Sequence, residues 1–241
     1  MKHYILLILV ITNIFALNLN PQMFKLNRVT NNTAIIDNIN AKIGESGIIL
    51  HQFSDKKISI LTYATIIKTT EKNATIKFLD DPVLKQDAIP TTNLKPQKND
   101  FFLLNHLYNA SLLITPNFRT ADTIEKLYPK NNFLNSDIFA SYLKMQNNPT
   151  PTNKDIQDFA KHHNLGTIFI AIKNKAYILD TFSFKILDTI TLDINDKSTQ
   201  VPFFTNVQEI KTSAWDWFSD DKINNYNTYY SNLIGLKNDR K

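Results

Sequence analysis

The hydrophobic pattern is clearest in residues 165–190, which read LGTIFIAIKNKAYILDTFSFKILDTI. Three runs rich in β-branched and aromatic residues lie within this stretch, at 167–172, 176–179 and 184–190, and polar turn residues separate them. Runs of this length and composition predict β-strands. The first run is apolar on both faces, which is typical of a strand in the centre of a sheet.

An earlier region of the chain shows a second series of strand patterns. We expect strands of an antiparallel meander at residues 33–37, 47–53, 58–67 and 74–78, with polar turns between them. Residues 101–107 predict the last strand of this part, and residues 17–32 are polar and Asn-rich, which predicts extended or loose chain. Prolines interrupt residues 80–96, so we expect a long ordered loop there. The pattern predicts a small antiparallel β-barrel-like part.

Helical spacing follows a short apolar strand at residues 111–115. Thr120 and Ser136 are the expected N-caps of two helices, and Thr152 with Asp155 forms a capping box for a third. Asp220 is the expected cap of a final helix, whose buried face comprises Ile223, Tyr226, Tyr230, Leu233 and Ile234. A strand, three helices and another strand, followed by hairpins, predict an α/β part with a mixed sheet.

The fold class that these patterns predict is therefore α+β. We expect a small β-barrel-like domain at residues 17–107 and a mixed α/β domain at residues 108–241, which ends in a helix and a short basic tail. The chain of 241 residues, 43% of them hydrophobic, is long enough for one large core or two small ones.

Residues 1–16 have the features of a secretory signal peptide. Lys2 and His3 precede an apolar run that ends at Ala16, after which we expect cleavage. The run is shorter than the ~20 residues of a transmembrane helix, and an uncleaved N-terminal anchor is the alternative. No cysteine follows, which excludes a lipoprotein anchor. The chain is expected to be exported.

The composition excludes several classes of function. The absence of cysteine rules out a thiol nucleophile, a disulfide framework and a thiolate metal site, and the four glycines argue against a Gly-rich phosphate loop. The net charge of +5 is spread along the chain, so it does not predict nucleic-acid binding.

The candidate chemical motifs favour structural roles. The sequence Gly44-Glu45-Ser46-Gly47 resembles a nucleophile elbow, but the motif needs glycine where Ile48 stands. Adjacent histidines such as His162 and His163 point about 100° apart on a helix, which does not suit a shared metal. The aromatic cluster of Trp215, Trp217 and Phe218 is expected to pack in a core. We therefore predict no catalytic residue, no metal site and no cofactor, although glycosidase carboxylates have no recognisable spacing.

Asn73 is a candidate glycosylation site. It opens an Asn-Ala-Thr sequon, with Glu71 two residues earlier, which matches the extended acceptor pattern of bacterial N-glycosylation. The sequon falls at a predicted hairpin turn, where an acceptor side chain is exposed. A chance match is the alternative.

Several phrases of the sequence occur together in one known family. They are residues 43–49 (IGESGII), 84–90 (LKQDAIP), 109–117 (NASLLITPN), 148–152 (NPTPT) and 215–218 (WDWF). In this order and spacing they resemble the N-terminal domain of the plasminogen-binding proteins PgbA and PgbB of spiral gastric and enteric bacteria. The likeness runs from about residue 35 to residue 236. Residues 165–187 are more weakly similar to the mixed α/β domains of periplasmic proteins such as TolB.

The resemblance implies a non-enzymatic protein on the cell surface or outer membrane that binds host plasminogen through the lysine-binding sites of its kringles. In that family a C-terminal lysine is the proposed ligand, and Lys241 matches it in position and type. The gastric proteins continue into a long charged region that this sequence lacks, so their binding could reside there. The alternative is a periplasmic or envelope-associated module that binds another bacterial protein and has no host ligand.

Overall fold

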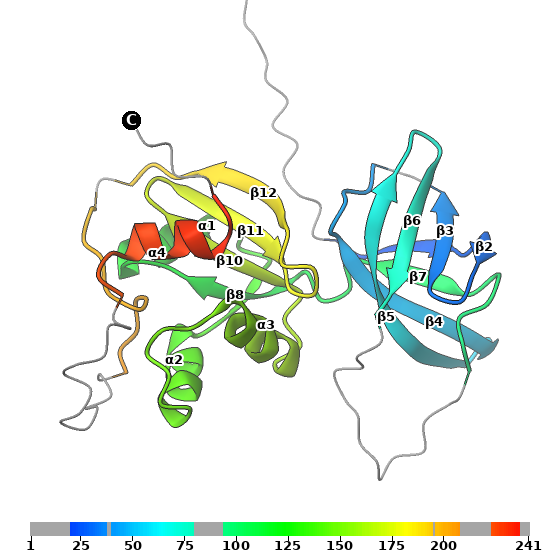
Figure 1. Cartoon of the computed structure of the whole chain (residues 1–241), viewed down its shortest axis with the longest axis horizontal. Helices are drawn as coiled ribbons and strands as arrows, with labels where there is room; N and C mark the ends of the chain where they lie inside the picture. Colours follow the sequence, from blue (N-terminus) through cyan, green and yellow to red (C-terminus); the bar gives the residue numbers. More distant parts are fainter. Residues whose placement is uncertain (1–19, 38–39, 80–93, 195, 208–222, 237–241) are drawn as a thin grey trace, which may run out of the picture.

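The computed structural model describes residues 20–37, 40–79, 94–194, 196–207 and 223–236. The chain folds into two units, each built on one β-sheet, and the two units lie side by side (Figure 1). The strands up to residue 104 belong to the first sheet and the strands from residue 110 to the second. This α+β architecture confirms the predicted fold class.

The first sheet is antiparallel throughout and has the strand order β1-β7-β4-β5-β6-β3-β2. Its strands are β1 (Gln22–Lys25), β2 (Arg28–Val29), β3 (Thr33–Asp37), β4 (Ser46–Ser54), β5 (Lys57–Thr69), β6 (Asn73–Phe78) and β7 (Phe101–Leu104). The two edge strands are consecutive in the chain and only Leu26 and Asn27 separate them, so the sheet curls until its edges meet at this bend.

The first two strands decide between the two states expected for residues 17–32. The stretch was expected to be extended or loose, and its part from Gln22 is extended, since β1 pairs with β7 from Gln22 with Leu104 to Lys25 with Phe101. Backbone pairing does not depend on side-chain polarity. Two of the apolar residues of this stretch, Phe24 and Leu26, are buried in the core of the curled sheet, whereas Met23 is 59% exposed.

The second sheet is mixed and has the order β12-β11-β10-β8-β9. Its strands are β8 (Ala110–Ile114), β9 (Asn132–Leu134), β10 (Thr167–Ile172), β11 (Lys175–Asp180) and β12 (Ile186–Thr191). The strand β8 runs parallel to both β9 and β10, whereas β11 runs antiparallel to both β10 and β12. The helices of the described chain are α1 (Phe118–Leu127), α2 (Ser136–Met145), α3 (Asn153–His162) and α4 (Tyr226–Leu233).

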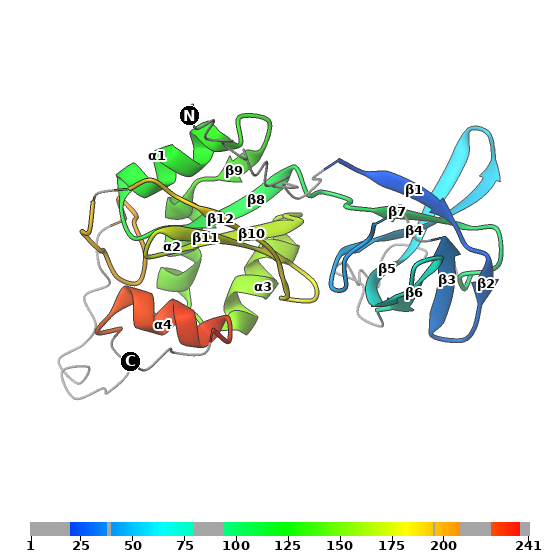
Figure 2. The same ribbon diagram turned by 90° about the horizontal axis from the view of Figure 1, so that it is seen from above.

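The central strand β10 separates two cores. All six of its residues are buried, as the apolar pattern predicted. Ile168, Ile170 and Ile172 face the core that contains α2, α3 and α4, whereas Phe169 and Ala171 face the core that contains α1. Figure 2 shows α1 on one side of the sheet and the other three helices on the opposite side. This alternation is the period-two geometry of a strand covered on both faces.

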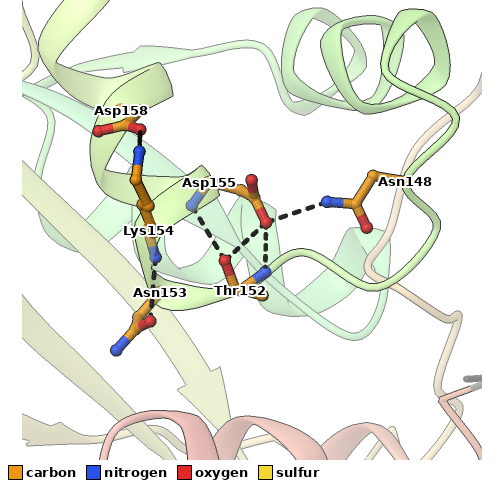
Figure 3. A network of polar contacts seen from close by, with 6 residues as sticks. All are labelled: Asn148, Thr152, Asn153, Lys154, Asp155 and Asp158. Carbon is orange, nitrogen blue, oxygen red and sulfur yellow. Dashed lines mark hydrogen bonds and ion pairs between the residues drawn. The ribbon is translucent and has the colours of Figure 1, made fainter.

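The helix α3 begins at the predicted capping box, which Figure 3 shows from close by. Thr152 Oγ1 accepts a hydrogen bond from Asp155 N, and the Asp155 carboxylate accepts one from Thr152 N at 2.8 Å. Asn148 donates to the same carboxylate at 3.0 Å. These bonds satisfy backbone groups that a helix end leaves without partners. On the outer face of α3, Lys154 pairs with Asp158.

The other helix caps differ from the expected ones by one to five residues. Asn117, rather than Thr120, caps α1 and accepts from Thr120 N at 2.8 Å. Asn135 caps α2, and Asn225, rather than Asp220, caps α4. Asparagine is as good an N-cap as serine or aspartate, so residue type alone did not decide between neighbouring candidates. The α4 helix ends before Gly235, as expected.

Two strands also stop short of their predicted ends. The strand β7 ends at Leu104, because Asn105 and Leu107 adopt φ values of 60° and 66°. The strand β12 begins at Ile186 rather than at residue 184, because Phe184 has φ 54°. A positive φ breaks the extended backbone. Leu107 and Phe184 give no sign of it in the sequence, whereas asparagine is enriched at positive φ.

Candidate functional site

The structure does not describe the residue predicted to bind plasminogen. Lys241 lies outside the described residues, as do residues 1–16 and the aromatic cluster of Trp215, Trp217 and Phe218. The predicted loop at residues 80–96 is described only from Leu94 onward. These expectations stay predictions.

Asn73, the candidate glycosylation site, is the first residue of β6 and is exposed. The turn before it is closed by Thr70 N, which donates to Asn73 O at 2.8 Å, and by Asn73 N, which donates to Thr70 Oγ1 at 3.0 Å. The sequon therefore opens at a β-hairpin turn, which was the expected location, with its acceptor side chain toward solvent.

A buried polar cluster joins the two sheets. Its centre is Asp180, the last residue of β11, which is fully buried. One carboxylate oxygen accepts hydrogen bonds from the backbone N–H groups of Phe182 at 2.9 Å and Ser183 at 2.6 Å. The other accepts from Tyr108 Oη at 2.6 Å and from Ser46 Oγ. Four donors therefore satisfy the carboxylate, and Ser46 comes from the first sheet.

Tyr108 completes this cluster from the connection between the sheets. Its hydroxyl donates to Asp180 and accepts from Ser46 N at 2.9 Å, so the group uses both its donor and an acceptor site. Burial raises the pKa of Tyr108 well above its usual range, and the charge of Asp180 adds to that shift. Burial likewise raises the pKa of Asp180, and the hydrogen bonds from Ser46, Tyr108 and Ser183 oppose it.

The loop before β4 contributes a second buried carboxylate. Glu45 is 5% exposed, and its Oε2 accepts from Lys42 N at 2.7 Å. Burial raises the pKa of Glu45, which the hydrogen bond from Lys42 and its positive charge partly counteract. Lys42 Nζ donates to Leu187 O on β12 at 3.1 Å, so the same loop also contacts the second sheet.

The β11–β12 loop packs against the curled sheet through an aromatic stack and a hydrogen bond to the backbone. Phe182 stacks on Tyr63 of β5 with 4.4 Å between ring centroids, and Lys161 Nζ lies 5.8 Å from the centre of the Phe182 ring. Ser183 Oγ donates to Gly44 O at 2.7 Å. Gly44 has φ 103°, and a Cβ at this position would lie 2.8 Å from Lys185 Cβ. The loop and the sheet therefore fit only with glycine there.

Asp180, Tyr108, Ser46, Glu45 and the β11–β12 loop together form the junction between the two sheets. The chemistry of these groups is that of a structural contact. Ser46, the serine of the elbow-like motif, is 1% exposed and donates its hydroxyl to Asp180 rather than to a histidine. His51, by contrast, pairs its Nδ1 with Asp100 Oδ1 at 2.7 Å on the curled sheet. In the described part of the chain, no three His, Asp or Glu side chains come close enough to hold a metal ion.

The open surface of the described chain carries two shallow cavities. One, of about 660 Å³, lies between the β1–β2 bend and the segment that enters β7, and Arg28, Lys95 and Lys98 line it. The other, of about 460 Å³, lies at the start of α1 and includes Phe118 and Arg119. Neither contacts the junction. Each helix that the structure describes is too short or too polar to span a bilayer.

Sequence reasoning did not identify the junction. Asp180 lies in the polar turn predicted between two strands and Ser46 in the elbow-like motif, and the two are 134 residues apart. Tyr108 lies 62 residues from Ser46. Patterns over a few neighbouring residues cannot predict contacts between residues so far apart in the chain. The one local feature that could have indicated the junction is the pair of glycines, Gly44 and Gly47, that flank two polar residues.

The fold and the junction define a two-unit α+β protein with open polar surfaces. A family model described as the N-terminal part of plasminogen-binding protein PgbA matches residues 21–234 of the chain. The chain belongs to this family, as the sequence phrases predicted. The match begins at residue 21 and so includes β1 and β2, which precede the phrases that carried the resemblance. No curated protein and no solved structure matches the chain.

Proposed function

We propose that this protein is an exported, surface-exposed binding protein that captures host plasminogen and catalyses no reaction. The observation that carries the proposal is membership of a family named for plasminogen binding, over residues 21–234. The match spans both sheets and the four described helices, so the shared region is the folded body of the protein and not one short motif.

The geometry of the buried polar groups supports binding over catalysis. Asp180, Glu45 and Asp100 are each at most 5% exposed, and each accepts hydrogen bonds from neighbouring groups of the chain. A catalytic acid or base has to reach a substrate. These three carboxylates instead stabilise loops and the contact between the sheets.

The proposed ligand for the plasminogen kringles is Lys241, the last residue of the sequence. A terminal lysine presents an ammonium and an α-carboxylate at a fixed separation. A pocket with carboxylates at one end, cations at the other and an aromatic floor can hold both groups. Two charge-assisted hydrogen bonds of about 1.5–3 kcal/mol each, with a cation–π contribution of about 1 kcal/mol, give roughly millimolar to micromolar affinity after entropy costs.

A matched pair of variants tests this ligand. Lys241→Ala removes the proposed ligand, and Lys237→Ala removes the same charge from the same tail. We expect Lys241→Ala to weaken plasminogen binding by at least about tenfold in surface plasmon resonance, since it removes a charge-assisted contact. Lys237→Ala should change the Kd less than about twofold. Equal Kd values for the two variants would exclude Lys241 as the ligand.

The surface location is tested separately, because a periplasmic module would have the same fold. Intact cells are treated with a protease, and the protein is followed by immunoblot beside a known periplasmic protein. Degradation of this chain with the periplasmic control intact is the expected result. Protection of both proteins would favour the alternative, an envelope-associated module that binds a bacterial partner.

We also propose that Asn73 accepts an N-linked glycan. Its support is the sequon with Glu71 and the exposed position at the β5–β6 turn. Intact-mass measurement of protein from the native cells should show one glycan on the wild type and none on Asn73→Gln. An unmodified wild-type mass would show that the sequon is a chance match.

A further inference from the structure

The groove at the β1–β2 bend has an unbalanced set of charges. Arg28 lines one wall from β2, and Lys95 and Lys98 line the facing wall, all three with exposed side chains. None of the three forms an ion pair within the described chain, and no carboxylate is among the lining residues. Three like charges around one cavity of about 660 Å³ repel one another, which an anionic ligand would relieve.

Among the described residues, two carboxylates, Asp100 and Asp37, accept hydrogen bonds from residues that line the groove. The Asp100 carboxylate is 4% exposed, accepts from Gln97 N at 2.9 Å and pairs with His51 at 2.7 Å. Asp37 Oδ1 accepts from Asn27 Nδ2 at 2.8 Å. No ion pair joins either carboxylate to Arg28, Lys95 or Lys98, so the three cations have no direct counter-ion among the described residues.

The two walls are held at a fixed separation by backbone hydrogen bonds. Asn99 N donates to Leu26 O at 3.0 Å, and Leu26 N donates to Asp100 O at 2.8 Å. Leu26 is fully buried and anchors the bend in the core. The backbone that carries Arg28 and that of Lys98 are therefore preorganised, which lowers the entropy cost of binding a ligand between them.

The neutral side chains of the groove indicate the class of ligand. Asn27, Thr30, Asn31 and Gln97 are amides and a hydroxyl that suit the hydroxyl groups of a sugar. No aromatic ring lines the groove, so it offers no platform for stacking a nucleobase. Its apolar lining is limited to Val29 and Pro96, too little to hold an acyl chain.

We propose that this groove binds an acidic oligosaccharide, with Arg28, Lys95 and Lys98 contacting its sulfate or carboxylate groups. Guanidinium and ammonium groups form charge-assisted hydrogen bonds with such oxyanions, and the amides bind the ring hydroxyls. The site shares no residue with the proposed plasminogen ligand, Lys241, and does not depend on it.

The test compares two triple variants that remove the same charge. Arg28→Ala/Lys95→Ala/Lys98→Ala removes the groove cations, and Lys130→Ala/Lys175→Ala/Lys197→Ala removes exposed lysines of the second unit. Binding of a heparin-derived hexasaccharide is measured by calorimetry at physiological ionic strength. We expect the groove variant to weaken binding by more than about tenfold, since it loses up to three charge-assisted contacts, and the control to change it less than about twofold.

Two further probes test whether the groove recognises an oligosaccharide rather than free sulfate or a lipid headgroup. Inorganic sulfate should compete only at concentrations far above that of the hexasaccharide, and vesicles containing phosphatidylglycerol should bind both triple variants equally. The proposal is overturned if the wild type does not bind the hexasaccharide or if the two variants lose affinity equally. Competition by sulfate at hexasaccharide concentrations, or loss of vesicle binding in the groove variant alone, would also overturn it. Circular dichroism checks that each variant is folded.

Discussion

The two ends of the curled sheet differ in the surroundings of their charged groups, which are buried and hydrogen-bonded at one end and exposed at the other. At the end that faces the second sheet, Asp180 is fully buried and accepts four hydrogen bonds. At the far end, around β2, Arg28, Lys95 and Lys98 line an open groove, and none of them forms an ion pair in the described chain. Figure 2 shows β2, the strand that carries Arg28, at the end of the curled sheet away from the second sheet. A buried charge is tolerated only with full satisfaction, whereas exposed charges remain available to a ligand. The buried end therefore supports the structure, and the open end is suited to binding.

The largest effect is expected from Asp180→Ala. The substitution leaves Tyr108 Oη, Ser46 Oγ and two backbone N–H groups buried without their acceptor. Each unsatisfied donor costs about 1–3 kcal/mol, so the free energy of unfolding should fall by more than about 3 kcal/mol. Urea denaturation measures it, with the exposed Asp193→Ala as the control, which should change stability by less than about 0.5 kcal/mol. Similar values for the two variants would show that Asp180 does not hold the junction.

Two glycines with positive φ form a matched pair that isolates the close approach of the two units. Gly44 has φ 103° and Lys185 Cβ 2.8 Å from its missing side chain, whereas Gly235 has φ 72° and nothing within 4 Å. Gly235→Ala should cost about 1 kcal/mol from backbone conformation alone. Gly44→Ala should cost about 2–3 kcal/mol, because the β11–β12 loop has to shift as well. Equal costs in thermal unfolding would contradict the packed junction.

A smaller effect is expected for Tyr108→Phe, which keeps the ring and removes the hydroxyl. Ser46 N then lacks its acceptor and Asp180 lacks one donor, so we expect a loss of about 1–2 kcal/mol. A double-mutant cycle with Ser46→Ala should give a coupling energy above about 0.5 kcal/mol, since both groups share one carboxylate oxygen. Additive effects would mean that the two side chains do not act together.

The smallest effect concerns pH. Burial raises the pKa of Glu45 in the folded protein above its value of about 4.3 in the unfolded chain. The folded state therefore binds this proton more tightly. The resulting stabilisation is complete below about pH 4 and is lost as the pH rises through the raised pKa. The difference in free energy of unfolding between wild type and Glu45→Gln should fall as the pH increases from about 4, and a rise would contradict the burial of Glu45.

The exposed Glu125→Gln is the control for this measurement. It should leave the pH profile parallel to that of the wild type. Asp180 also has a raised pKa, so Glu45→Gln should remove only part of the pH dependence of the wild type.

The sequence predicted those features of the fold that depend on residues close together in the chain. The bounds of β10 followed from an apolar run on both faces, and the capping box of α3 followed from two residues within one turn. The junction and the groove could not be predicted in this way. Ser46 and Asp180, or Arg28 and Lys95, come together only after the sheets have formed. A positive φ at Leu107 or Phe184 also has no sign in the residue type, whereas asparagine, as at Asn105, adopts positive φ several-fold more often than most residues.

The central claim, that this protein captures plasminogen through lysine-dependent contacts, is tested most directly by competition. Plasminogen binding to the immobilised protein is measured while 6-aminohexanoic acid, a lysine analogue, is titrated in. The matched control is 6-acetamidohexanoic acid, which keeps the carboxylate but lacks the ammonium. We predict that the analogue reduces binding to baseline and that the acetylated control does not. Binding that persists at saturating analogue would contradict the account.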